Sequence, residues 1–139
     1  MASDASNILQ ILYISTLSVD VADIDFQQLL EISRKNNAIN DITGVMCVAE
    51  MHFIQILEGP ENKLIKLYSK ILDDARHHDC ILLGISHIHE KSFKDWSMGY
   101  IKNPDAKIIL NKNELLKYRD RTRAQELVKI MRQIISLLK

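Results

Sequence analysis

Two polar residues with versatile side chains interrupt otherwise apolar stretches of the sequence. Tyr13 shares one face with the apolar residues of the stretch 8–15, and Gln55 shares one face with those of 52–58, by period-two alternation. A buried phenol or carboxamide needs a hydrogen-bond partner, because leaving one unsatisfied costs about 1–3 kcal/mol. Both groups can donate and accept hydrogen bonds. Taken alone, they are most simply interpreted as satisfied polar groups of a core.

Histidines and cysteines are the other candidates for chemistry, and they form no convincing set. His87 and His89 would share one face of a strand, which suits two metal ligands, and His77 stands next to His78. No acidic residue or cysteine has the spacing to complete a metal site, so we expect ordinary histidines in a strand and a loop, and no bound metal. The two cysteines, at positions 47 and 80, lie within apolar stretches and have neither metal-ligand nor redox spacing, which predicts buried structural thiols.

An enzymatic active site is not expected. The four glycines are scattered at positions 44, 59, 84 and 99, so no glycine-rich phosphate loop exists. No serine stands in a nucleophile elbow, and neither cysteine has a catalytic context. On local patterns alone, Asn37 is best explained as a helix C-cap and Trp96 as a core residue.

Composition is typical of one globular domain with no strong electrostatic preference. The 139 residues are 47% hydrophobic, and 18 basic residues balance 18 acidic ones. No overall charge therefore favours binding to nucleic acid or to an anionic membrane. Residues 1–7 lack the pattern of a signal peptide, and no apolar run approaches the ~20 residues that cross a bilayer. We expect a cytoplasmic protein with no direct nucleic-acid or membrane partner.

The hydrophobic periodicity alternates between strand and helix in a recognisable order. Strands are predicted over 8–15, 42–49, 52–58, 80–89 and 93–101, and helices over 23–37 and from Pro60 to about Asp74. The order β-α-β-β-α-β with one further strand predicts an α+β fold of the ferredoxin-like kind. We expect a five-stranded mixed sheet with both helices on one face, followed by C-terminal helices.

The last segment, after Pro104, predicts a helical tail with an apolar stripe. That stripe comprises Leu127, Ile130, Met131, Ile134, Ile135 and Leu138. It could cover the open face of its own sheet or pair with another protomer, and the sequence does not decide between them. We expect residues 1–103 to form the main domain and residues 104–139 a helical extension of that same domain.

Several segments, taken in order, resemble the BLUF family, the sensors of blue light using flavin. The similar segments are Leu12-Tyr13-Ile14-Ser15, the run from Asn36 to Gly44, the run from Phe53 to Gly59, Arg76-His77-His78, and the run from Phe93 to Met98. They follow the family's order and spacing from about Ile8 to Ile101. Each match alone is weak, whereas the ordered set is a specific signal.

The resemblance implies a flavin, usually FAD with FMN as the alternative, held without a covalent bond between the two helices and the sheet. Tyr13 matches the family's photoactive tyrosine, Gln55 the glutamine that bridges this phenol and the flavin, and Asn37 the asparagine that binds the flavin's carbonyl edge. Trp96 and Met98 match the fifth-strand pair implicated in passing the signal on. Further positions that the resemblance places near the flavin are Leu29, Ser33, Asn36, Lys70, Ile71, Asp74, His77 and His78.

The resemblance also implies a photochemical switch in a receptor that is not an enzyme. Light drives electron and proton transfer from Tyr13 to the flavin, and Gln55 returns with rearranged hydrogen bonds. Because no output domain follows in this sequence, we expect the signal to pass through strand five and the C-terminal helices to a separate protein, or to a homo-oligomer. The alternatives are a ferredoxin-like ligand-binding regulatory module without photochemistry and a small hydrolase on the same topology.

Overall fold

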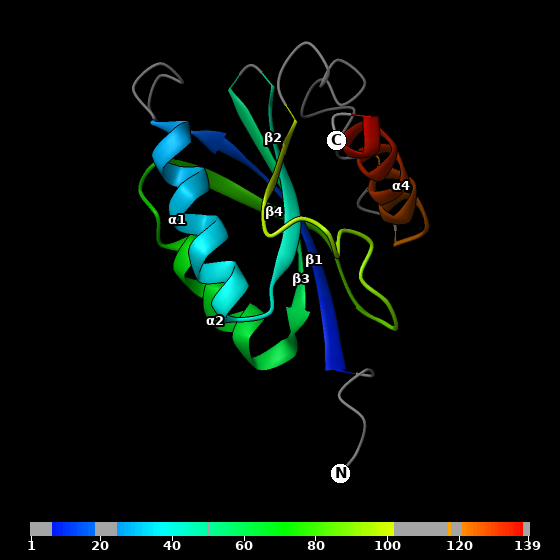
Figure 1. Cartoon of the computed structure of the whole chain (residues 1–139). Coiled ribbons are helices and arrows are strands. Elements are labelled where there is room, and N and C mark those ends of the chain that lie inside the picture. The colour runs from blue at the N-terminus through cyan, green and yellow to red at the C-terminus, as the bar shows by residue number, and fades with distance from the viewer. Residues whose placement is uncertain (1–6, 19–24, 50, 102–116, 118–120, 138–139) are drawn as a thin grey trace.

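The computed structural model describes residues 7–18, 25–49, 51–101, 117 and 121–137. Its elements in chain order are β1 (Ile8–Leu17), α1 (Phe26–Ile39), β2 (Thr43–Ala49), β3 (His52–Pro60), α2 (Glu61–Leu72), β4 (His77–Ile88), β5 (Gly99–Ile101) and α4 (Arg121–Leu137). Figure 1 shows α1 and α2 packed on one face of the sheet and α4 on the opposite face.

The sheet has five strands in the order β4-β1-β3-β2-β5. β1 pairs antiparallel with β3 and with β4, β2 pairs antiparallel with β3, and β5 runs parallel to β2. The predicted mixed five-stranded α+β fold is therefore confirmed.

The fifth strand is shorter than predicted. It spans only Gly99–Ile101, whereas the sequence predicted a strand from Phe93. The preceding segment forms turns instead, because the amides of Ser92 and Phe93 donate to Glu58 and the amide of Trp96 donates to the carbonyl of Phe93. Trp96 and Met98 consequently precede the strand on which they were expected to lie.

The fourth strand is longer than predicted and begins at His77. His77 and His78 were expected in a loop, but they pair with Leu17 and Thr16 at the end of β1. Two irregularities in the β1–β4 register absorb this extension, one between Leu12 and Tyr13 and one before Thr16.

The first helix also extends past its predicted end. Asp25 caps its N-terminus by accepting a hydrogen bond from the amide of Gln28 at 3.0 Å. The C-cap is Asn40 rather than Asn37, so the interpretation of Asn37 as a cap is wrong. Asn37 lies inside the last turn with its side chain buried, and its position has to be explained by what it contacts there.

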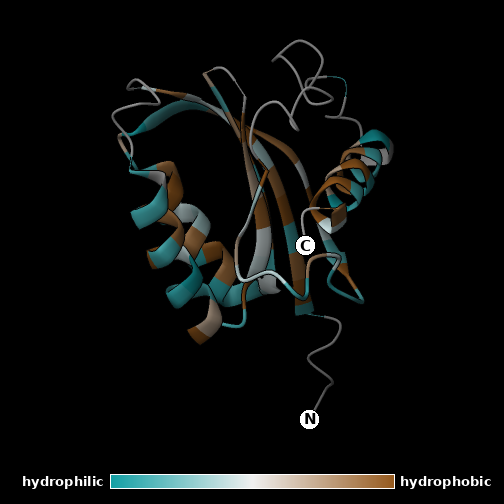
Figure 2. Cartoon of the chain, turned by 45° about the horizontal axis from the view of Figure 1, so that its top comes forward, coloured by the Kyte–Doolittle hydropathy of each residue, from teal (hydrophilic) through white to brown (hydrophobic). Residues whose placement is uncertain are grey.

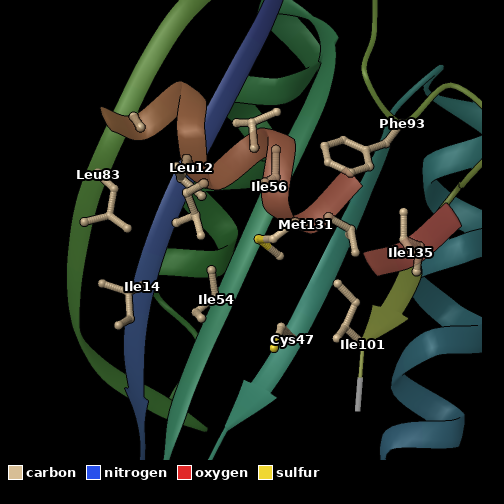
Figure 3. Close-up of a cluster of buried hydrophobic side chains, with 14 residues drawn as sticks. Leu12, Ile14, Cys47, Ile54, Ile56, Leu83, Phe93, Ile101, Met131 and Ile135 are labelled. Carbon is tan, nitrogen blue, oxygen red and sulfur yellow. The ribbon is translucent and has the colours of Figure 1, made fainter. Parts of the chain in front are cut away.

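Both faces of the sheet are covered by apolar side chains, as expected for a sheet between two helical layers. Toward α1 and α2 the core contains Leu9, Ile11, Tyr13, Leu17, Leu30, Ile42, Met46, Val48, Phe53, Leu57, Leu64 and Met98. Toward α4 it contains Leu12, Ile14, Val45, Cys47, Ile54, Ile56, Leu83, Phe93, Ile101, Ala124, Leu127, Val128, Met131 and Ile135, ten of which Figure 3 labels.

The C-terminal helix covers the otherwise open face of its own sheet. Leu127, Met131 and Ile135 are buried there, and Ile130 and Ile134 pack at the edge of the same cluster. Figure 2 shows the apolar side of α4 turned toward the sheet. Of the two possibilities that the sequence left open, intramolecular packing accounts for these residues, while Leu138 of the predicted stripe lies outside the described residues.

Candidate functional site

A pocket of about 250 Å³ lies between the sheet and the two helices α1 and α2. Its walls come from β1, α1, β2, β3, α2, the turn after α2, the start of β4, and the residue that precedes β5. The lining residues are Tyr13, Leu17, Leu29, Ile32, Ser33, Asn36, Asn37, Met46, Phe53, Gln55, Leu57, Leu67, Lys70, Ile71, Asp74, Arg76, His77 and Met98. The structure thus brings together every residue that the family resemblance placed near the flavin except His78.

Tyr13 and Gln55 form the polar centre of this pocket. They stand directly opposite each other on β1 and β3, and the Tyr13 hydroxyl donates to Gln55 Oε1 at 2.5 Å. Tyr13 has no exposed surface, and its ring packs against Tyr68 at 5.5 Å and Phe53 at 6.2 Å between centroids. Burial, and to a smaller extent the nearby Cys80, raises the pKa of Tyr13 well above its usual value, so the phenol keeps its proton until another group accepts it.

The amide nitrogen of Gln55 retains donor capacity. Among the described residues it contacts only the thioether of Met98, with Nε2 and Sδ 3.6 Å apart. A thioether is a weak acceptor, and the amide has two hydrogens to donate. The free donor capacity of Gln55 therefore fits a ligand that carries acceptor nitrogen or oxygen atoms.

Helix α1 holds the segment that leads into β5. Asn37 Nδ2 donates to the carbonyl of Ser97 at 2.7 Å, and Arg34 Nε donates to the carbonyl of Met98 at 2.9 Å. The bond to Ser97 explains the buried position of Asn37, which contacts both the pocket and this segment. Arg34 was not predicted, and nothing in its sequence context signalled the contact.

Trp96 and Met98 lie on opposite faces of the sheet. Met98 belongs to the core on the pocket side, whereas Trp96 packs against the core on the α4 side. The backbone of Trp96 is fixed to β2, because its carbonyl accepts from the amide of Gly44 at 3.0 Å. Gly99 follows directly, and a Cβ atom added there would lie 3.0 Å from Ile135 Cδ1 and 3.3 Å from Trp96 Cε3. The chain thus passes from the pocket to α4 within four residues.

Charged and polar groups gather at the mouth of the pocket beyond α2. Arg76 donates to both carboxylate oxygens of Asp74, through Nε at 3.0 and 3.1 Å and through a terminal nitrogen at 2.5 Å. Hydrogen bonds from Arg76 lower the pKa of Asp74, and the same contact raises the pKa of Arg76. Lys70 lines the same mouth, so two cationic side chains face the space where an anionic ligand group could lie.

His77 and His78 are neighbours in sequence with different environments. His77 connects the strand to α2, with Nδ1 2.7 Å from Ser15 Oγ and Nε2 2.5 Å from the carbonyl oxygen of Ile71. His78 points away from the pocket and contacts Ser18 Oγ at 2.9 Å at the surface. Alternation along β4 separates them, and the sequence did not predict a strand here.

Several lining residues were not among the predicted site residues. They are Leu17, Ile32, Met46, Phe53, Leu57, Leu67 and Arg76. Strand alternation with Tyr13 and Gln55 was the available signal for Leu17, Phe53 and Leu57. Arg76 belongs to a segment that resembles the family, but only the tertiary fold places it at the pocket.

The remaining candidates for chemistry are separate from the pocket. No group of three or more histidine, cysteine or acidic side chains in the described residues could hold a metal ion. His87 instead contacts Glu61, with Nε2 and Oε1 2.5 Å apart. Cys47 is buried, which raises its pKa to about 12, whereas Cys80 is only partly buried, so its expected full burial is wrong. None of the helices described here is long and apolar enough to cross a membrane.

The family model for sensors of blue light using FAD matches residues 8–99, well over half of the 139-residue chain. The structure resembles that of BlrB, a BLUF protein in its dark state, with a TM-score of 0.79 and 24% identity over 93% of this chain and 98% of that one. It also resembles the BlsA ground state, with a TM-score of 0.67 and 28% identity over 80% of this chain and 84% of that one.

Curated relatives give the same family relationship at the level of sequence. A photoactivated adenylate cyclase subunit beta of Euglena longa is 29% identical over 98 residues, which are 70% of this chain and 11% of that protein. The blue light- and temperature-regulated antirepressor BluF of Escherichia coli is 30% identical over 83 residues, 60% of this chain and 21% of that protein. The matched segment is thus a small part of these longer relatives.

Proposed function

Because the chain belongs to the family of sensors of blue light using FAD, we propose that it is a blue-light receptor whose switch is the hydrogen-bond arrangement of Gln55. The observation that carries this proposal is the buried Tyr13–Gln55 pair facing a pocket of about 250 Å³. The family is one of sensors, in agreement with the expectation that this chain is not an enzyme.

The residues of the pocket fit a flavin ring on chemical grounds. A bound flavin would absorb blue light and would then accept an electron and a proton. Tyr13 supplies both, because its hydroxyl stays protonated in the dark and already donates its hydrogen to Gln55 Oε1. Gln55 is held loosely at its other end by Met98, so its carboxamide can change orientation or tautomer when the Tyr13 proton moves.

The dark and lit states then differ in the partners of one carboxamide. Because Gln55 is buried, mismatched partners of its carboxamide are costly, so neighbouring groups must adjust. Besides Tyr13, the side chain of Met98 contacts Gln55 directly. A change at Gln55 therefore acts first on the segment that carries Trp96 and Met98, which are the residues we propose to relay the signal.

We assign the remaining contacts to holding the flavin. Asn37 and Asn36 supply amide groups beside the ring, and Leu29, Ser33 and Ile71 supply its walls. Lys70 at the pocket mouth, with His77 and the Asp74–Arg76 pair beside it, suits a phosphate group, and we propose FAD as the bound form. His78 points to the surface, and we give it no role in the dark-state pocket.

The decisive test is an absorption spectrum of the purified protein in the dark and after blue illumination. The proposal expects flavin bands that shift slightly to the red and recover in the dark. In Tyr13→Phe the flavin should remain bound and the shift should be lost. A normal shift in that variant would refute the switch, and failure of the wild-type protein to bind flavin would favour a ligand-binding regulatory module without photochemistry.

The form of the flavin can be tested separately. Chromatography of the flavin released by denaturation distinguishes FAD from FMN. Lys70→Gln should weaken binding of FAD but not of riboflavin, which has no phosphate. Lys66→Gln, on the same helix and away from the pocket lining, is the matched control. Equal affinities of both variants for FAD would remove Lys70 from the phosphate site.

For output, we propose that residues 1–103 and the helical extension 104–139 act as one domain that signals to a separate protein or to a second copy. Deleting α4 is a poor test, because it would uncover the apolar face that Leu127, Met131 and Ile135 bury. Leu137 is 84% exposed at the end of α4 and can be changed without disturbing that core. If Leu137→Lys leaves the dark and lit molecular masses identical to those of the wild type, this end of α4 does not mediate self-association.

A further inference from the structure

Glu58 is a fully buried acidic residue that the photochemistry does not use. Its side chain points to the face opposite the pocket, because β3 alternates and Gln55 and Leu57 face the flavin side. Its Oε1 accepts from the amide of Phe93 at 2.9 Å, and its Oε2 accepts from the amide of Ser92 at 2.9 Å. One carboxylate therefore fixes two consecutive amides at the start of the segment that leads to Trp96 and Met98.

The same carboxylate is connected to α4 through a second polar residue. Gln10 Nε2 donates to Glu58 Oε2 at 2.9 Å, and Gln125 Nε2 donates to Gln10 Oε1 at 3.1 Å. Gln10 is itself buried, so its two contacts satisfy the carboxamide inside the protein. A continuous chain of hydrogen bonds thus links α4 to the backbone of Ser92 and Phe93.

The segment 92–99 is consequently held at two ends that differ in kind. At its beginning, Glu58 accepts hydrogen bonds of 2.9 Å from two backbone amides, and Phe93 is buried beneath α4. At its end, the carbonyls of Ser97 and Met98 accept hydrogen bonds from α1, and the Met98 side chain makes a weak thioether contact with Gln55. The end that touches Gln55 is the end whose contacts change in the proposed switch.

We propose that Glu58 is a positioning residue for signal relay. It is the fixed anchor against which the Met98 end of the segment moves, and Gln10 and Gln125 tie α4 to that anchor. Displacement at Met98 is then transmitted to α4 near Ile135, while the Gln125 end of the helix stays in place. This inference rests on the proposed photoreceptor function, and it adds residues that lie outside the flavin pocket.

The test is hydrogen exchange of the flavin-loaded full chain, measured in the dark and under blue light for Glu58→Gln and for the control Glu31→Gln on the exposed side of α1. A glutamine presents one oxygen and one NH₂ group, so at least one of the Ser92 and Phe93 amides loses its acceptor. In Glu58→Gln we expect about tenfold faster exchange of the Ser92 and Phe93 amides in the dark and a normal flavin red shift. The change in amide exchange between dark and light across residues 121–137 should be at least twofold smaller than in the wild type. Unchanged exchange at Ser92 and Phe93, or a full-sized α4 response, would overturn the proposal.

A second pair of variants keeps the test valid if Glu58→Gln does not fold. Gln125 and Gln133 are both exposed on α4, and only Gln125 contacts Gln10. In the wild type, light should change amide exchange more near Ile135 than near Gln125. Gln125→Met should at least halve this difference between the two ends of α4, whereas Gln133→Met should leave it unchanged. Identical behaviour of the two variants would overturn the proposal. A wild-type protein without a light-induced flavin shift would instead refute the proposed function, and dark exchange in Glu58→Gln would still test the anchor.

Discussion

The contact between Gly99 and α4 permits a quantitative test of how the pocket side and the helix side are coupled. In Gly99→Ala the new Cβ would lie 3.0 Å from Ile135 Cδ1, 3.2 Å from Ile135 Cγ1 and 3.3 Å from Trp96 Cε3. Ordinary contacts of a Cβ atom begin near 3.4 Å, so the neighbours must move by a few tenths of an ångström. All three atoms belong to side chains, which makes the substitution tolerable.

The expected cost follows from two opposing effects. Overpacking a well-filled core costs about 1–3 kcal/mol, and replacing glycine at a φ that alanine accepts stabilises by about 0.4–1 kcal/mol through the unfolded state. Gly99 has no positive φ, so the second effect applies. We expect a net loss of about 1 kcal/mol, which lowers the melting temperature by about 3–5 °C for a domain of this size.

A double-mutant cycle identifies the contact responsible. Ile135→Val removes Cδ1, the nearest atom to the new methyl group, and alone should cost about 1 kcal/mol. If the clash with Cδ1 is the cause, Gly99→Ala with Ile135→Val should cost about 1 kcal/mol less than the sum of the single variants. Ile134→Val, which changes the preceding residue of α4 and leaves this contact intact, should be additive with Gly99→Ala.

The assay is denaturant unfolding of each variant, followed by the fluorescence of the single tryptophan and by circular dichroism. Additivity of Gly99→Ala and Ile135→Val within about 0.5 kcal/mol would refute the reasoning. It would mean that the strand shifts as a whole and that Ile135 does not sense the position of Gly99.

Three further predictions concern single sites. Gly44→Ala should destabilise the fold by at least about 3 kcal/mol in denaturant unfolding. The new Cβ would lie 2.2 Å from the backbone carbonyl oxygen of Ile56, which cannot move aside. A near-neutral variant would contradict the close approach of β2 and β3. Because burial raises the pKa of Tyr13 above the usual value near 10, the unfolded state releases this proton first, so stability should fall as pH rises above about 10. Tyr13→Phe should make that decline shallower in unfolding curves across alkaline pH, and an unchanged slope would show that the phenol is not protected from ionising. An alkylating reagent should modify Cys80 before Cys47 in the native protein, as detected by mass spectrometry, since Cys47 is buried and its pKa is raised to about 12. The reverse order would contradict the placement of β2.

The sequence predicted the central pair of the pocket because strand alternation is a local rule. Tyr13 and Gln55 each stand on a face of apolar residues, and a polar residue on such a face must have a partner. That the two are partners of each other depends on the β1–β3 register, which alternation alone does not determine. The roles of the residues around them remain predictions that rest on family resemblance.

The element boundaries that were predicted wrongly depend on contacts between segments distant in sequence. Phe93, Trp96 and Met98 have the composition of a strand, yet Glu58 captures the backbone at Ser92 and Phe93 from 34 and 35 positions away. His77 and His78 have the polarity of a loop, yet the end of β1 offers them a strand to pair with. The apolar stripe of α4 was correctly identified, but its partner surface exists only after the sheet has formed.

The placement of Trp96 and Met98 on opposite faces of the sheet would separate the two tasks of the proposed receptor, light sensing and output. In the proposed receptor, the residues of the flavin pocket lie on the α1–α2 side, and the output surface would lie on the α4 side. Substitutions on the outer surface of α4 can therefore accumulate without altering the chromophore pocket. For evolution, this separation would allow such a receptor to acquire new partners while its pocket stays constant. For engineering, the exposed positions of α4 are the place to graft new binding specificity.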